Sequence, residues 1–159
     1  MHPLVTAVAE YLIYPAGLVA VLAWLTLPAG DRWRLAVQAT AGAVLTLAVV
    51  QLANHAYYDP RPFVSGHVRP YFAHPADNGF PSDHTAVIAL AGVLLWPYRR
   101  VVSVGLLGAA VLVGVTRVVA HVHTPLDIVA ALVIAALGGT GGLWLGGLAW
   151  TRWRARHAG

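Results

Sequence analysis

Five long apolar stretches restrict what this chain can fold into more than any other feature of its sequence. They run over residues 4–27, 34–57, 82–97, 101–120 and 125–150. A helix needs about 20 mostly apolar residues to cross a bilayer, and the third stretch, which is shorter, can place its polar start among the lipid headgroups. The sequence therefore predicts an all-α, polytopic membrane bundle of about five transmembrane helices, forming one domain over residues 1–159.

The composition agrees with a membrane protein and excludes several functional classes. Hydrophobic residues make up 58% of the chain and charged residues only 10%, whereas soluble domains carry about a quarter charged residues. The chain has no cysteine, so disulfides, cysteine-ligated metals and cysteine nucleophiles are excluded. All ten basic residues are arginines, and most stand at the ends of apolar stretches, so the net charge of +4 does not indicate a nucleic-acid-binding surface.

The arginines also predict how the bundle is oriented. Seven of them follow the first, third and fifth apolar stretches, which end on the same side if the spans alternate: Arg32, Arg34, Arg99, Arg100, Arg152, Arg154 and Arg156. By the positive-inside rule, that side is the cytoplasm. We therefore expect the N-terminus outside and the C-terminus in the cytoplasm. We also expect a retained first helix rather than a cleaved signal peptide, because no basic segment precedes its long apolar run.

The opposite side of the predicted bundle collects the remaining polar residues. Arg61, Arg69 and Arg117 fall there against the charge rule, together with most of the histidines and aspartates. The loop over residues 58–81 belongs to this side and contains five prolines. Loops of this length are usually functional or disordered, and the prolines favour a fixed, packed loop. A functional site is therefore expected on this outer side.

Two helices are predicted to begin at this site. Ser82 is a good N-cap residue, which places Asp83 and His84 in the first turn of the third apolar stretch. Thr124 is a second good N-cap residue, and the proline after it suits the first helical position, so Asp127 occupies the third position. A helix N-terminus offers free N–H groups and a partial positive charge. Both helix starts are therefore suited to binding an anion.

The charged residues near these helix starts indicate that the anion is a phosphate. Arg61 and Arg117 can bind phosphate through paired hydrogen bonds. His84 and His123 can supply a nucleophile and a proton donor. Asp127 lies four residues after His123 and can hold its imidazole in the tautomer needed for attack, as in a hydrolytic triad.

Several of these features also have purely structural interpretations. His123 and Asp127 could form a simple hydrogen bond at a helix start, and Thr124 with Asp127 could form a capping box, although a box usually uses Glu or Gln at that position. His121 lies one helical turn after an arginine and is expected to be a wall residue of the site.

Other polar and small residues leave alternatives open. Glu10 lies in or near the first expected span, so it is either functional or a headgroup-level residue. His67 and His74 could suggest a metal, but no partner stands at a usual ligand spacing, so we predict no metal site. Three glycines spaced by four residues on the last span favour packing inside the bundle over a dimer interface. They are Gly138, Gly142 and Gly146.

Three segments together resemble the type 2 phosphatidic acid phosphatase superfamily. Its first motif is Lys, six residues, Arg-Pro, and residues 54–62 match it with Asn54 in place of Lys. Its second motif is Pro-Ser-Gly-His, and residues 81–84 match it with Asp83 in place of Gly. Its third motif is Ser-Arg, five residues, His, three residues, Asp, and residues 116–127 match it with Thr in place of Ser. The order along the chain is also the family's order.

The resemblance implies a reaction and a role for each matched residue. His123 would attack phosphorus and form a phosphohistidine, while His84 would protonate the leaving group and then help to activate water. Asp127 would orient His123. The resemblance implies no metal and no cofactor. The phosphate-binding set would be Arg61, Arg117, Ser82 and the amides near Asp83.

The substrate is the least determined part of the prediction. Asp83 and the segment "HPADNGFPSDH" resemble the branch that hydrolyses undecaprenyl pyrophosphate, which implies an active site on the extracytoplasmic side of a bacterial cytoplasmic membrane. Asn54 could donate a hydrogen bond where the family has Lys, or Arg69 could supply the charge. A phosphatidate or phosphatidylglycerol-phosphate phosphatase is the alternative within this chemistry.

A non-catalytic lipid-binding protein or a transporter is the alternative of another class. Transporters usually carry polar residues at mid-membrane and paired repeats. This chain has its polar groups at one end and no internal repeat. The sequence leaves the exact lipid and the oligomeric state open.

Overall fold

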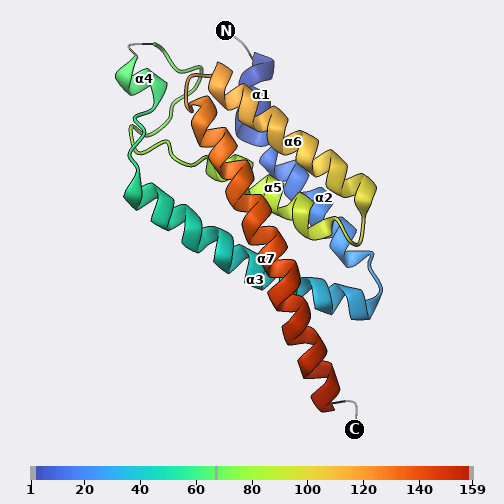
Figure 1. The fold of residues 1–159 in the computed structure, drawn as a ribbon. Helices are drawn as coiled ribbons and strands as arrows, with labels where there is room; N and C mark the ends of the chain where they lie inside the picture. Colours follow the sequence, from blue (N-terminus) through green and yellow to red (C-terminus); the bar gives the residue numbers. More distant parts are fainter. Residues whose placement is uncertain (1–2, 67, 158–159) are drawn as a thin grey trace.

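A computed structural model describes residues 3–66 and 68–157, and every regular element within them is a helix (Figure 1). The all-α prediction is confirmed. His67 lies outside the described residues. The helices are α1 (Pro3–Tyr11), α2 (Ile13–Leu25), α3 (Ala29–Ala56), α4 (Pro62–Ser65), α5 (Asp83–Leu95), α6 (Arg100–Val119) and α7 (Pro125–His157).

The first expected span is broken into two helices. The axes of α1 and α2 differ by 42°. Pro15 accounts for the break, because it has no N–H for the carbonyl of Tyr11 and its ring crowds that carbonyl. The helices α3, α6 and α7 are each long and apolar enough to cross a membrane, and α1 with α2 would make a fourth span if the bent pair acts as one.

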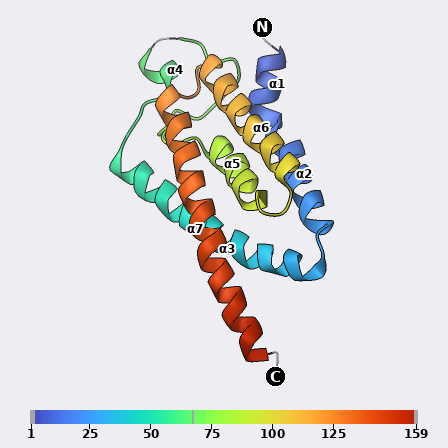
Figure 2. The same cartoon turned by 45° about the vertical axis from the view of Figure 1, so that its right-hand side comes forward.

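The third expected span is shorter than a membrane crossing. Helix α5 has 13 residues, which is about 20 Å of helix against about 30 Å of hydrocarbon. It lies at the centre of the bundle, where it contacts α2, α3, α6 and α7 (Figure 2). By length and composition, the described residues thus contain three spanning helices, or four with the bent pair. The third expected span, α5, is a short helix with a mostly buried surface.

The two longest helices, α3 and α7, cross with their backbones in contact (Figures 1 and 2). A Cβ atom added to Gly142 would collide with the backbone of Gly42, and one added to Gly146 would collide with Gln38. Small residues allow this close approach in membrane bundles. The glycine stripe on α7 therefore packs inside the bundle, as expected. The buried Gln38 adds polar bonds, since its Nε2 donates to the carbonyl of Leu143 at 2.9 Å.

The loop between α3 and α5 reaches the end of the molecule where α6 stops and α7 starts (Figure 1). It contains the single turn of α4, and its backbone is tied to α6 by a bond from Tyr71 N to the carbonyl of Ala120 at 3.2 Å. The other end of α7, which carries three arginines, extends away from the bundle (Figure 2). The long loop thus lies over the helix ends that carry the predicted site.

The α3–α7 crossing gives a stability prediction. Gly142→Ala places a methyl group against the backbone of Gly42, which cannot move aside, so it should lower the free energy of unfolding by about 1–3 kcal/mol. Gly105→Ala is the matched control, because an exposed Cβ there meets nothing within 4 Å. It should leave stability unchanged or raise it by up to about 1 kcal/mol. Thermal unfolding in detergent measures both, and equal effects would contradict the backbone contact.

Candidate functional site

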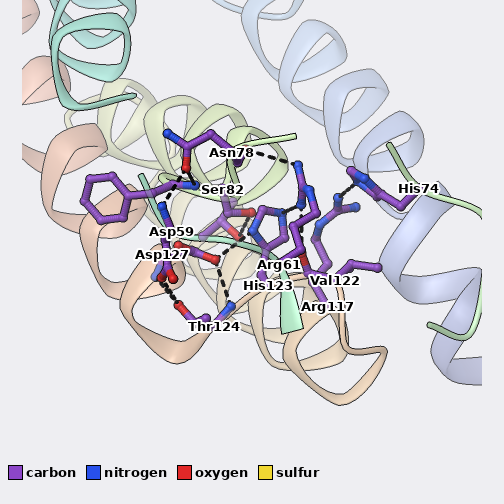
Figure 3. A network of polar contacts seen from close by, with 12 residues as sticks. Asp59, Arg61, His74, Asn78, Ser82, Arg117, Val122, His123, Thr124 and Asp127 are labelled. Carbon is purple, nitrogen blue, oxygen red and sulfur yellow. Dashed lines mark hydrogen bonds and ion pairs between the residues drawn. The ribbon is translucent and has the colours of Figure 1, made fainter. Parts of the chain in front are cut away.

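His123 lies in the turn between α6 and α7, and Asp127 lies in the first turn of α7 (Figure 3). The chain leaves α6 through His121, whose positive φ of 61° turns it sharply toward α7. His123 and Asp127 are buried, and His123 Nδ1 lies 3.1 Å from Asp127 Oδ2. The four-residue spacing predicted from the sequence thus brings the two side chains into a direct hydrogen bond.

The capping-box interpretation holds at the same time. Asp127 Oδ2 also accepts from the backbone N–H of Thr124 at 2.7 Å, and the N–H of Asp127 donates to Thr124 Oγ1 at 3.3 Å. These reciprocal bonds form a capping box with Asp in the third position. One carboxylate oxygen therefore starts α7 and holds His123, so the two interpretations are not alternatives.

The hydrogen bonds of His123 determine which nitrogen carries the proton. Nδ1 donates to the Asp127 carboxylate, so in the neutral ring Nε2 keeps its lone pair. Arg61 Nη1, which can only donate, lies 3.3 Å from that Nε2. Burial lowers the pKa of His123, the Asp127 hydrogen bond raises it, and the charges of Arg117 and Arg61 lower it, with a net lowering. The site therefore favours a neutral imidazole whose Nε2 carries no proton.

Arg61 is held in place by the long loop and by the turn before α7. Its Nε donates to Asp77 Oδ1 at 2.8 Å and its Nη1 to the carbonyl of Val122 at 2.7 Å. Burial raises the pKa of Asp77, but the hydrogen bond and charge of Arg61 lower it more, so this carboxylate stays ionised. The guanidinium is buried and has little freedom to move.

Asn78 fixes the base of the loop, and Asn54 takes part. The Asn78 side chain accepts from the N–H groups of Asp59 and Phe80 and donates to the carbonyls of Asn54 and Tyr57. Asn54 Nδ2 donates to the carbonyl of Phe80 at 3.0 Å. This places Asn54 as a brace beneath the segment that leads to α5, and a direct contact with phosphate stays a prediction.

The second arginine arrives from α6. Arg117 is buried, its Nη1 donates to the carbonyl of Ala9 at 3.0 Å, and its Nη2 lies 2.8 Å from His74 Nε2 (Figure 3). Its Nε has no hydrogen-bond partner within the described residues. The break after α1 exposes the Ala9 carbonyl for this bond, since a continuous helix would use it for the N–H four residues later.

The start of α5 also belongs to the site. Ser82 occupies the N-cap position, as predicted, and is completely buried. Its hydroxyl lies 3.2 Å from Thr85 Oγ1, and its N–H donates to the carbonyl of Asp127 at 3.3 Å. Asp83 is exposed and His84 is half-buried in the first turn. The two predicted helix starts are thus bonded to each other.

A pocket of about 210 Å³ opens beside these groups. Its lining comes from α1, α2, the long loop, α5 and α6: Glu10, Tyr11, Tyr14, Phe72, Ala73, His74, His84 and Arg117. Glu10 also borders a neighbouring groove whose lining includes Arg69. No group of three or more histidine or acidic side chains among the described residues is arranged to hold a metal.

Sequence reasoning missed part of this site. It treated His74 as an ordinary loop residue and gave no role to Asp77 or Asn78. In the structure His74 contacts Arg117, Asp77 pairs with Arg61, and Asn78 fixes the base of the loop. Sequence reasoning also missed Asp59, which accepts from Thr124 Oγ1 at 2.9 Å. All four belong to a loop without periodicity, where spacing does not reveal which residues return to the helix ends. The only available signal was the density of polar residues just before "PSDH".

Comparisons with known proteins agree with the geometry. The family model of the PAP2 superfamily matches residues 35–153. Undecaprenyl-diphosphatase BcrC of Bacillus subtilis (strain 168) is 30% identical over 83% of this chain and 68% of its own length. Putative undecaprenyl-diphosphatase YbjG of Escherichia coli (strain K12) is 32% identical over 87% and 70%. Bacitracin transport permease protein BcrC of Bacillus licheniformis is 28% identical over 91% and 71%.

No solved structure matches this chain significantly. The family model alone covers about three quarters of the sequence and includes all three motif segments. This chain therefore belongs to the PAP2 superfamily.

Proposed function

We propose that this chain removes the terminal phosphate of undecaprenyl pyrophosphate through a phosphohistidine, without a metal. As a member of the PAP2 superfamily it is a multi-pass membrane phosphatase of lipid phosphates or pyrophosphates. The relatives named undecaprenyl-diphosphatases support the choice of a pyrophosphate. The proposed domain is the whole chain, residues 1–159, with its active-site segments at 54–62, 81–84 and 116–127.

The observation that carries the proposal is the orientation of His123. Its Nδ1 is bonded to a buried carboxylate, and its Nε2 lone pair points at a buried guanidinium. A phosphoryl group drawn to Arg61 would therefore lie against the nucleophilic nitrogen. In the first step an Nε2–P bond forms and the bond from phosphorus to the bridging oxygen breaks. Burial and the charge of Arg117 lower the pKa of His84 to about 4, and the negative charge of the bound pyrophosphate raises it again, so His84 is protonated in the complex. His84 gives its proton to that oxygen, and the lipid monophosphate leaves.

The second step returns the enzyme to its starting state. Water attacks phosphorus, His84 takes a proton from it, and the Nε2–P bond breaks to release inorganic phosphate. Arg61, Arg117 and the amides at the start of α5 stabilise the charge on the non-bridging oxygens. Asp127 keeps the imidazole oriented while it becomes positively charged. The fixed cations take the electrostatic role that a metal has in other phosphatases.

The lipid substrate and the location of the site are proposed together. The pocket beside His84 and Arg117 is bordered by Tyr11 and Tyr14, whose rings are largely exposed on the first two helices. A pyrophosphate headgroup could enter there while its apolar tail stays in the bilayer. The arginine distribution supports an extracytoplasmic location for this end, in a bacterial cytoplasmic membrane.

Phosphate release by the purified protein in detergent tests the substrate. With EDTA present, we expect release from undecaprenyl pyrophosphate to exceed release from phosphatidate or phosphatidylglycerol phosphate. Preferred release from either glycerolipid would retain the chemistry and overturn the substrate. No release from any of the three by a folded protein would overturn the enzymatic proposal and favour a lipid-binding role.

The covalent step can be detected by trapping. Substrate labelled in the terminal phosphate and quenched during turnover should leave label on the protein that survives alkali and is lost in acid, as an N–P bond is. His123→Ala should abolish both the label and turnover, with a loss of at least about 10³-fold. His157→Ala, at an exposed histidine at the end of α7, is the control and should behave as wild type. Label that persists in His123→Ala would place the nucleophile elsewhere.

The pH dependence follows from the lowered pKa of His123. Only the deprotonated ring attacks, so a lowered pKa keeps His123 active at pH values below the ordinary histidine range, and activity is lost as the pH falls through the lowered value. Asp127→Asn removes an influence that raises this pKa, so the acidic limb of kcat/KM should move to lower pH. The rate should fall by about 10²- to 10⁴-fold because the tautomer is no longer held. A shift of that limb to higher pH would contradict the assignment.

A further inference from the structure

His74 stands in the site although no motif includes it. It lies ten residues before His84 in the long loop, and its ring centroid is 6.3 Å from that of His123, with the two rings nearly perpendicular. It is half-buried and lines the same pocket as His84 and Arg117. Figure 3 shows it bonded to Arg117. The long loop thus places His74 beside Arg117 at the end of α6 and beside His123 just before α7.

The partners of the His74 ring define its protonation state. A guanidinium has only donors, so His74 Nε2 must accept from Arg117 Nη2, 2.8 Å away. Nδ1 then carries the proton and faces the carbonyl of Pro75 at 3.3 Å. Burial and the charge of Arg61 lower the pKa of His74 to about 4, which keeps the ring neutral at physiological pH. Both ring nitrogens therefore have partners that match the neutral form.

The position of the Arg117 guanidinium depends strongly on its contact with His74, because Arg117 has fewer partners than Arg61. Arg61 is bonded to a carboxylate and to the carbonyl of Val122. Arg117 has only His74 and the carbonyl of Ala9, and no carboxylate in the described part of the chain forms an ion pair with it. Its Nε is buried without a partner. Arg117 is therefore oriented by neutral acceptors, which leave its positive charge available to an anion.

We infer that His74 is a positioning residue that holds the Arg117 guanidinium in place to bind the substrate phosphate. This inference rests on the proposed function and extends it to the loop. A carboxylate in the same place would orient Arg117 equally well but would offset part of its charge. The neutral imidazole orients the guanidinium without that loss. His74 itself makes or breaks no bond to phosphorus in this role.

Two variants separate the hydrogen bond from the packing of the ring. His74→Phe keeps an aromatic ring and removes the acceptor, whereas His74→Gln keeps an acceptor at a similar distance from the backbone. Orthovanadate serves as the phosphate-shaped probe, because its stabilisation of the folded protein against heat reports binding without turnover. We expect His74→Phe to weaken vanadate binding by roughly tenfold and His74→Gln to recover most of it. His157→Ala should match wild type.

Coupling to Arg117 distinguishes positioning from general structure. In an Arg117→Lys background, His74→Phe should weaken vanadate binding by less than about twofold further, because its effect passes through the missing guanidinium. The same pattern is expected in KM for the lipid. Equal losses in both backgrounds, or vanadate binding by His74→Phe equal to wild type, would overturn the inference.

The outcome can be separated from that of the proposed function. If wild type releases phosphate and His74→Phe matches it in binding and KM, only the inference fails. If wild type releases no phosphate but binds vanadate in a manner dependent on His74, the inference about Arg117 stands and the catalytic proposal fails. A wild type that neither turns over nor binds vanadate would overturn both.

Discussion

The site depends on a single carboxylate oxygen, Oδ2 of Asp127. It accepts from the N–H that starts α7 and from the ring of His123, so helix initiation and imidazole orientation share one atom. The carbonyl of the same residue accepts from Ser82 at the start of α5. Gly79 packs so closely that a Cβ atom there would lie 3.2 Å from Oδ2. Loss of this oxygen would therefore loosen two helix starts, the loop and the nucleophile together, because a buried polar group is costly to leave unpaired.

The two arginines show how a membrane protein can keep cations buried at one end of a bundle. Arg61 is paired with the exposed carboxylate of Asp77, so part of its charge is neutralised at the protein surface. Arg117 faces a backbone carbonyl and a neutral imidazole. Both are positioned before any ligand arrives, which avoids the entropy of ordering long side chains during binding. The difference in their partners means that the two cations would not attract an anion equally.

The sequence predicted those parts of the molecule that are governed by local spacing. The apolar stretches correspond to helices in the expected places, and the four-residue interval between His123 and Asp127 becomes a direct bond. It did not predict the break at Pro15, because hydropathy is continuous across it. Nor did it predict the return of His74 to α6, since that contact joins residues 43 positions apart through a loop without periodicity. Contacts of this kind depend on the completed fold rather than on any local pattern.

The bond from Arg117 to the carbonyl of Ala9 has a consequence for biosynthesis. It joins α1 with α6, across 108 residues of sequence. A nascent chain that has inserted only α1 to α5 contains neither Arg117 nor His123, so it cannot assemble the anion site. The first helix must instead wait in the bilayer until α6 arrives beside it. Hydrolytic competence would thus be acquired only after α6 and the start of α7 have been synthesised.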